Sequence, residues 1–101
     1  MIYARLASGE VMRDDEFEWD DRKAAANERK HEVSFEFARL AFDDPMAIDE
    51  EDPDPDEERY NRLCCFDNSL VVVCYTDRGD RVRIISARKA HKHEQHIYQI
   101  Q

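Results

Sequence analysis

Apolar and polar positions in the first half of the chain predict one strand and two helices. Residues 17–19 alternate apolar, polar, apolar, which indicates a short strand. The alanine-rich stretch at 20–30 predicts a helix, capped by Asp20 or Asp21 because a carboxylate accepts the free amides at a helix start. A second helix is predicted to begin at Ser34, so the two form a helical hairpin that must cover a sheet. The apolar face of the second helix consists of Phe35, Ala38, Leu40, Ala41 and Phe42.

The second half predicts three strands and a terminal helix. The strands are apolar-rich runs separated by turn residues, and they lie at 59–66, 70–76 and 82–86. Residues 87–99 predict the helix, whose inward-facing side chains would be Ala87, Ala90, Ile97 and Ile100. A strand, two helices, an antiparallel meander and a final helix predict an α+β fold with the helices on one face of the sheet.

Residues 43–58 separate the two halves. They contain ten acids, no bases and all three prolines of the chain. This composition predicts a flexible, solvated loop, with room for one short strand near Met46–Ile48.

Charge is distributed unevenly along the chain. The net charge is −9, but residues 1–58 hold 20 acids and 7 bases, whereas residues 59–101 hold 4 acids and 8 bases. An acidic total therefore does not exclude a basic surface that binds nucleic acid.

Length and cysteine content indicate a single domain in a reducing compartment. A chain of 101 residues with 42% hydrophobic content can build one compact core. Cys64, Cys65 and Cys74 are odd in number, lack metal-site spacing and indicate reduced core thiols. The chain has no apolar run of membrane-spanning length and no signal-peptide pattern at its start, which predicts a cytoplasmic protein without a membrane partner.

Basic residues concentrate where the last strand is predicted to meet the last helix. Arg81 and Arg83 share a strand face by the period of two, and Arg88 and Lys92 would share a helix face. Cations are unfavourable in the first turn of a helix, which points to a functional site. The residues alone leave two interpretations open. The arginines contact phosphate, or they protect an edge strand from sheet pairing while Arg88 pairs with an upstream carboxylate.

Short motifs occur in a characteristic order from residue 17 to residue 98. They are Trp19–Asp20, Asn27, Lys30–His31, Ser34–Phe35, Glu58–Tyr60, Val73–Thr76, Arg78–Lys89, Glu94 and Tyr98. This order resembles the BrnT family of toxins of bacterial type II toxin–antitoxin systems, which are small ribonucleases of the RelE-like superfamily. The resemblance implies a RelE-like fold at residues 17–101, with an N-terminal strand and a helical hairpin packed on an antiparallel sheet, and a C-terminal helix. Residues 1–16 would be an N-terminal extension, in which alternation at 2–6 predicts a further strand.

The resemblance also implies RNA cleavage without a metal. Such cleavage needs a base for the ribose 2′-hydroxyl, cations for the phosphate and an acid for the leaving 5′-oxygen. The catalytic candidates that supply these types are His31, Arg81, Arg83, Arg88, Glu94 and Tyr98. The RNA-binding candidates are Arg59, Lys89 and Lys92. His31 has an equally good interpretation as a helix C-cap, where the helix dipole favours its charged form.

Three histidines near the C-terminus invite a metal interpretation. On one helix, however, His91 and His93 would lie about 200° apart, and only His93 and His96 would be neighbours. No nearby cysteine completes a set of ligands. We therefore expect neither a metal site nor a cofactor.

The resemblance implies a BrnA-like ribbon-helix-helix antitoxin and RNA as partners, with operator DNA contacted indirectly through the antitoxin. Two alternatives are a degenerate, non-catalytic toxin kept for partner binding and promoter regulation, and a ParE-like inhibitor of DNA gyrase. Three positions depart from the family pattern. Glu32 replaces a glycine, Cys64 lies in a changed strand motif, and His91 replaces a threonine. These departures affect the expected catalytic competence more than the expected fold.

Overall fold

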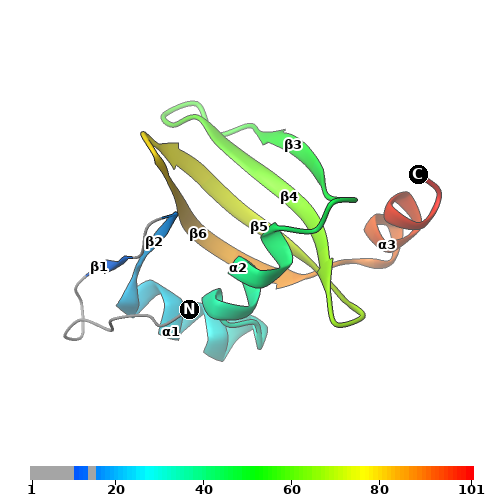
Figure 1. Cartoon of the computed structure of the whole chain (residues 1–101), viewed down its shortest axis with the longest axis horizontal. Coiled ribbons are helices and arrows are strands. Elements are labelled where there is room, and N and C mark those ends of the chain that lie inside the picture. The colour runs from blue at the N-terminus through cyan, green and yellow to red at the C-terminus, as the bar shows by residue number, and fades with distance from the viewer. Residues whose placement is uncertain (1–10, 14–15) are drawn as a thin grey trace.

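The computed structural model describes residues 11–13 and 16–101 of the chain. Within them, three helices accompany a six-stranded sheet of order β1-β2-β6-β5-β4-β3 (Figure 1). The strands are β1 (Val11–Arg13), β2 (Phe17–Asp20), β3 (Ile48–Asp52), β4 (Arg59–Phe66), β5 (Ser69–Arg78) and β6 (Arg81–Lys89). The helices are α1 (Asp21–His31), α2 (Phe35–Phe42) and α3 (Lys92–Gln99). The predicted α+β class is confirmed, but the prediction that all helices lie on one face was wrong, because Tyr98 of α3 packs against Leu63 and Val72 on the face opposite α2.

The sheet is antiparallel except at one pair of strands. β2 runs parallel to β6, with Phe17 opposite Val82 and Glu18 opposite Arg83. The predicted antiparallel sheet is confirmed at the other strand pairs, and the parallel pair was not predicted. The connection explains the parallel direction, because the helical hairpin and the meander bring the chain back beside β2 in the same direction.

Side-chain caps fix the helical hairpin as predicted. The Asp20 carboxylate accepts hydrogen bonds from the amides of Arg22 and Lys23, at 2.9 and 3.1 Å. The Ser34 hydroxyl accepts one from the amide of Phe37 at 3.0 Å. Between the helices, Glu32 adopts the left-handed conformation with φ of 59°.

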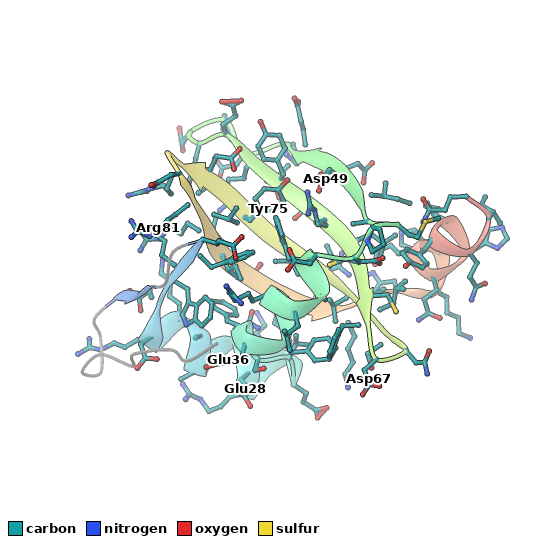
Figure 2. The ribbon with its side chains drawn as sticks, viewed as in Figure 1. Glu28, Glu36, Asp49, Asp67, Tyr75 and Arg81 are labelled. Atoms are coloured by element: carbon teal, nitrogen blue, oxygen red, sulfur yellow. The ribbon has the colours of Figure 1, made fainter. Side chains whose placement is uncertain are left out.

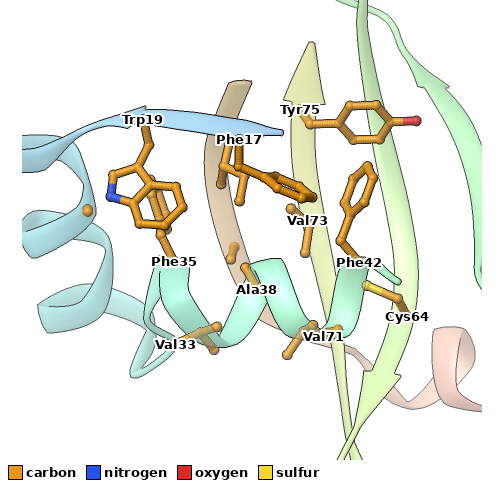
Figure 3. Packing of buried hydrophobic residues seen from close by; sticks show 14 residues of the cluster. Phe17, Trp19, Val33, Phe35, Ala38, Phe42, Cys64, Val71, Val73 and Tyr75 are labelled. Atoms are coloured by element: carbon orange, nitrogen blue, oxygen red, sulfur yellow. The ribbon is translucent and has the colours of Figure 1, made fainter. Parts of the chain in front are cut away.

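The core lies between α2 and the sheet face that it covers (Figure 3). Aromatic rings meet edge to face, with Trp19 against Phe35 at 5.8 Å and Phe42 between Phe17 and Tyr75 at 5.2 and 4.8 Å. Such pairs add to the free energy gained by burying apolar area. Leu40, which we predicted on the apolar face of α2, is 48% exposed.

The acidic segment contains β3, which begins later and is longer than the short strand predicted near Met46–Ile48. β3 pairs with the whole length from Arg59 to Leu63 of β4. Ion pairs explain how so acidic a strand joins the sheet, since Asp49 bonds Arg62 at 2.8 and 2.9 Å and Asp52 lies 3.6 Å from Arg59. The carboxylates are thus compensated by the neighbouring strand.

The prediction of a helix over 87–99 was wrong at its start, because β6 continues to Lys89 and α3 begins at Lys92. Ala87 pairs with Val73 and Arg88 with Val72, so ladder pairing and burial override the local preference for helix. Ala87 and Ala90 are buried as predicted. Ile97 and Ile100 are 46% and 67% exposed, and their inward placement was wrong.

A bulge in β6 changes which residues share a face. Tyr75 lies opposite Ile84, but Cys74 lies opposite Ser86, so Ile85 is an extra residue. Strict alternation had placed Ser86 with Ile84. The bulge moves Ser86 onto the face that carries Arg83.

Part of the N-terminal prediction is untested. The predicted strand at residues 2–6 lies outside the described residues, and the domain boundary at residue 17 stays a prediction. Residues 11–13 form β1, which pairs antiparallel with β2 at the sheet edge. No helix in the described part of the chain is long and apolar enough to span a bilayer.

Candidate functional site

The face of the sheet opposite α2, called the open face from here on, carries most of the candidate residues. Strand register arranges its side chains in three rows. The row nearest the β5–β6 turn contains Glu18, Arg83, Thr76, Arg59 and Asp52. The middle row contains Ser86, Cys74, Asn61 and Glu50. The row nearest α3 contains Arg88, Val72, Leu63 and Ile48. The open face therefore changes from charged to apolar along the strands.

Arg88 and Glu94 form the strongest contact at the α3 end of the open face. The guanidinium bonds both carboxylate oxygens, at 2.8 and 2.9 Å. The Arg88 hydrogen bonds hold the pKa of Glu94 down at about 2, and the same pairing raises the pKa of Arg88. At neutral pH both groups are charged, and so acidic a carboxyl is a weak general base in this state.

His91 adds a second contact to the Glu94 carboxylate. Its backbone amide donates to Glu94 Oε1 at 2.7 Å, and its ring Nδ1 lies 3.8 Å from the same oxygen. His91 is the N-cap of α3 in extended backbone, so Glu94 both caps the helix and holds Arg88. The carboxylate would keep one partner if Arg88 were withdrawn.

Tyr98 lies one turn further along α3 and contacts the apolar row. Its ring packs with Leu63, Val72 and Ala90, and its hydroxyl donates to Asp44 Oδ2 at 2.6 Å. This hydrogen bond raises the pKa of Tyr98 to about 12. Burial alone would raise the pKa of Asp44, but hydrogen bonds from Tyr98 and two backbone amides lower it. Tyr98 is consequently a protonated donor at neutral pH.

The arginines of the far row are also paired with carboxylates. Arg83 Nη1 lies 3.3 Å from the buried Glu18 carboxylate, and Arg59 bonds Asp54 at 2.8 Å. Arg81 lies at the β5–β6 turn, at the other end of β6 from Arg88 (Figure 2). A seven-residue separation along a strand is roughly 20 Å. Each of Arg59, Arg83 and Arg88 therefore has a carboxylate partner, which reduces the net positive charge of the open face.

Comparison with protein families assigns the chain. The model of the family described as ribonuclease toxin, BrnT, of type II toxin–antitoxin system matches residues 19–94. The chain belongs to this BrnT family. Membership implies RNA as the substrate and a protein antitoxin as the partner. No curated protein matches the chain.

The match covers α1, α2 and most of the sheet, including the strands that form the open face. It includes Arg59, Arg83, Arg88 and Glu94 and ends before Tyr98. The strand-to-helix junction predicted as a site is thus part of what this chain shares with BrnT toxins. Its geometry differs from expectation, because Arg88 projects from β6 rather than from a helix and shares no helix face with Lys92.

Three candidate residues lie apart from the Arg88–Glu94 pair. His31 ends α1, and among the described residues no hydrogen bond or ion pair joins it to Arg88 or Glu94. Lys89 points to the opposite side of β6 from Arg88 and lies 3.5 Å from Glu32. Lys92 is exposed in the first turn of α3. Only Arg88 and Glu94 of the predicted catalytic set are brought into direct contact.

A cavity of about 650 Å³ links two candidates across the end of the sheet. Lys89 lines it from the α1 side and Tyr98 from the α3 side, with Phe37 and Leu70 among the apolar residues between them. The end of β6 also borders the cavity, through Lys89 and the following Ala90. A ligand that contacts Tyr98 can therefore also reach Lys89.

Sequence reasoning missed His91 and Asp44 as members of the site. The signal for His91 was Glu94 three residues later, the spacing of a capping box, but histidine is not a usual cap. The rings of His91 and His93 lie 5.9 Å apart, closer than predicted, because His91 precedes the helix. Within residues 11–13 and 16–101, no group of three or more potential ligands is arranged to hold a metal ion.

Proposed function

We propose that this BrnT protein is a metal-independent endoribonuclease of the mRNA-interferase type that acts in the cytoplasm and binds RNA on the open face. The observation that carries the proposal is the bidentate contact of Arg88 with Glu94 at 2.8 and 2.9 Å. A guanidinium that binds a carboxylate in this way presents the same two donors to a phosphate. A substrate phosphate takes the place of the Glu94 carboxylate on Arg88.

This exchange would change the chemistry of Glu94. Without the Arg88 hydrogen bonds, the pKa of Glu94 rises from about 2 towards the ordinary range of a carboxylic acid. A less acidic carboxyl is a stronger base, so substrate binding itself produces the base. Arg88 meanwhile balances the charge that develops on the phosphate in the transition state.

Proton transfers then follow from the groups near the phosphate. Glu94 takes the proton of the 2′-hydroxyl, and the 2′-oxygen attacks phosphorus as the bond to the 5′-oxygen breaks. Tyr98 supplies the proton for the leaving 5′-oxygen, because its hydroxyl is protonated at neutral pH and more acidic than the alcohol that leaves. The products are a 2′,3′-cyclic phosphate and a free 5′-hydroxyl, and no outside reactant is needed.

The far row of the open face supports RNA binding beyond the cleaved phosphate. Arg83 and Arg59 flank Thr76, four residues along β5 from the Arg88 row, which is about 13 Å. Cations spaced in this way can follow the backbone of a single strand. Arg81, Lys89 and Lys92 would add charge at the borders of the surface.

One observation favours the non-catalytic alternative. Arg59, Arg83 and Arg88 already have carboxylate partners, so RNA must displace each of them. A degenerate toxin retained for partner binding would keep these ion pairs intact, because it does not need the arginines for RNA cleavage. Measured cleavage by the isolated protein distinguishes the two functions.

We further propose a BrnA-like ribbon-helix-helix antitoxin that neutralises the toxin at the open face and carries it to operator DNA. The arginines there suit an acidic antitoxin segment as well as RNA. Opposite charges speed association in a manner that salt suppresses. Charge reversal at Arg83 should therefore slow antitoxin association and flatten its dependence on salt.

The test of the catalytic proposal is RNA cleavage in EDTA by protein purified without antitoxin. We expect cleavage to persist in EDTA and to fall by about two decades in Arg88→Ala, because a lost transition-state cation typically costs a few kcal/mol. Arg29→Ala, which removes an exposed arginine of α1, is the matched control and should cleave at the wild-type rate. Cleavage that needs added divalent ions, or that survives in Arg88→Ala, would contradict the proposal.

A further inference from the structure

Asn27 is a buried polar residue of α1 that lies outside the candidate catalytic set. Its side chain is bonded through both ends of the amide. Nδ2 donates to the carbonyl of Val33 at 3.0 Å and to the carbonyl of Ala87 at 2.8 Å, and Oδ1 accepts from the amide of Ala87 at 3.1 Å. One side chain thus connects three parts of the chain: α1, the segment between α1 and α2, and β6.

The two bonds to Ala87 replace a missing strand. Among the described residues, β2 pairs with β6 only at Val82 and Arg83, and no other described strand pairs with this edge of β6 beyond them. Ala87 is fully buried, and an unpaired amide or carbonyl there would be costly. The Asn27 amide supplies one acceptor and one donor, as a neighbouring strand residue would.

The position of this contact bears directly on Arg88. The bulge at Ile85 inserts one residue into β6 just before Ala87, and a one-residue slip of a strand moves every side chain to the other face. Such a slip would turn Arg88 away from Glu94. A fixed partner at Ala87 holds the register in which Arg88 lies on the open face and Lys89 on the side of Glu32.

We propose that Asn27 is a positioning residue for RNA cleavage, which holds the end of β6 so that Arg88 faces the substrate phosphate. The inference rests on the proposed function of Arg88. Asn27 touches no reacting atom in this role. It acts through the Ala87 backbone, and its effect on the rate comes from the placement of a cation, where an error of about 1 Å can cost up to a hundredfold.

Two variants and one control separate positioning from general stability. Asn27→Leu removes all three hydrogen bonds at similar size, and Asn27→Asp keeps the acceptor for the Ala87 amide but sets an oxygen against the carbonyls of Val33 and Ala87. Ser34→Ala is the control, because it removes one hydrogen bond of the same helical hairpin, 3.0 Å long, without touching β6. Circular dichroism and urea unfolding establish that each variant is folded at the assay temperature.

The first readout is the single-turnover cleavage rate at saturating and subsaturating RNA. We expect both Asn27 variants to lose on the order of ten- to a hundredfold in the rate at saturation, and Ser34→Ala to stay within about twofold. In an Arg88→Ala background the Asn27 substitutions should have almost no further effect. Equal losses in both backgrounds would overturn the proposal.

The second readout needs no activity. Titration of the Glu94 carboxyl by carbon NMR reports its pairing with Arg88, and the wild-type pKa is about 2. We expect the pKa to rise in both Asn27 variants towards that of Arg88→Ala, and to stay unchanged in Ser34→Ala. A wild-type protein without cleavage would refute the proposed function. An unchanged Glu94 titration in folded Asn27 variants would refute the positioning role.

Discussion

The Arg88–Glu94 pair makes the stability of this BrnT toxin depend on pH in a predictable direction. Because the pKa of Glu94 is lower in the folded chain, the stabilisation is present well above the usual value of 4.5 and is lost as the pH falls towards 2. A shift of this size has an upper limit of about 3 kcal/mol. The Arg88 side chain is 34% exposed, so solvent screening reduces the expected contribution to about 1–2 kcal/mol.

Glu94→Gln tests this magnitude because glutamine keeps an acceptor for the His91 amide and removes the charge. In urea unfolding at pH 7 we expect the variant to be about 1–2 kcal/mol less stable than the wild type. The difference should be more than half lost at pH 3. Glu28→Gln, at an exposed position of α1, is the control and should change stability by less than about 0.5 kcal/mol. A difference that stays constant from pH 7 to pH 3 would refute the reasoning.

Three further predictions concern single residues. Tyr98→Phe removes the hydrogen bond to Asp44 and should lower the unfolding free energy by about 1 kcal/mol in urea, and an unchanged value would show that the bond adds nothing. Glu32→Gly relieves the left-handed conformation and should raise stability by about 0.5–1 kcal/mol, whereas Glu28→Gly inside α1 should lower it. Burial raises the pKa of Cys64 to about 12, so its thiol should react with a disulfide reagent only after unfolding, and labelling of the native protein would contradict this.

Local signals predicted the helical hairpin and the strands that follow the acidic segment. Asp20 and Ser34 are caps because their side chains meet the first free amides, a relation confined to three residues of sequence. The turn at Asp67 and Asn68 is equally local, and both residues adopt positive φ. Such elements need no knowledge of the rest of the chain.

Contacts between distant segments explain what the sequence could not predict. Residues 87–89 are all good helix formers, but Ala87 pairs with Val73 on one side and bonds Asn27 on the other. The acidic strand β3 has its carboxylates Asp52 and Asp49 paired with Arg59 and Arg62 of β4. Residue types therefore indicated Arg88 and Glu94 as site residues. Their direct pairing could not be predicted, because it depends on β6 continuing to Lys89 so that Arg88 projects from the strand towards α3.

The proposed mechanism depends most on one exchange, in which an RNA phosphate replaces the Glu94 carboxylate as the partner of Arg88. A short RNA with its 2′-hydroxyls methylated binds without being cleaved, so the Glu94 carboxyl can be titrated by carbon NMR in the bound state. We expect saturating RNA to raise the pKa of Glu94 from about 2 by one unit or more, because the carboxylate loses its hydrogen bonds with Arg88. One unit corresponds to about 1.4 kcal/mol of lost interaction. A Glu94 pKa that remains at about 2 in the saturated complex would contradict the mechanism, because Arg88 would then still hold the carboxylate.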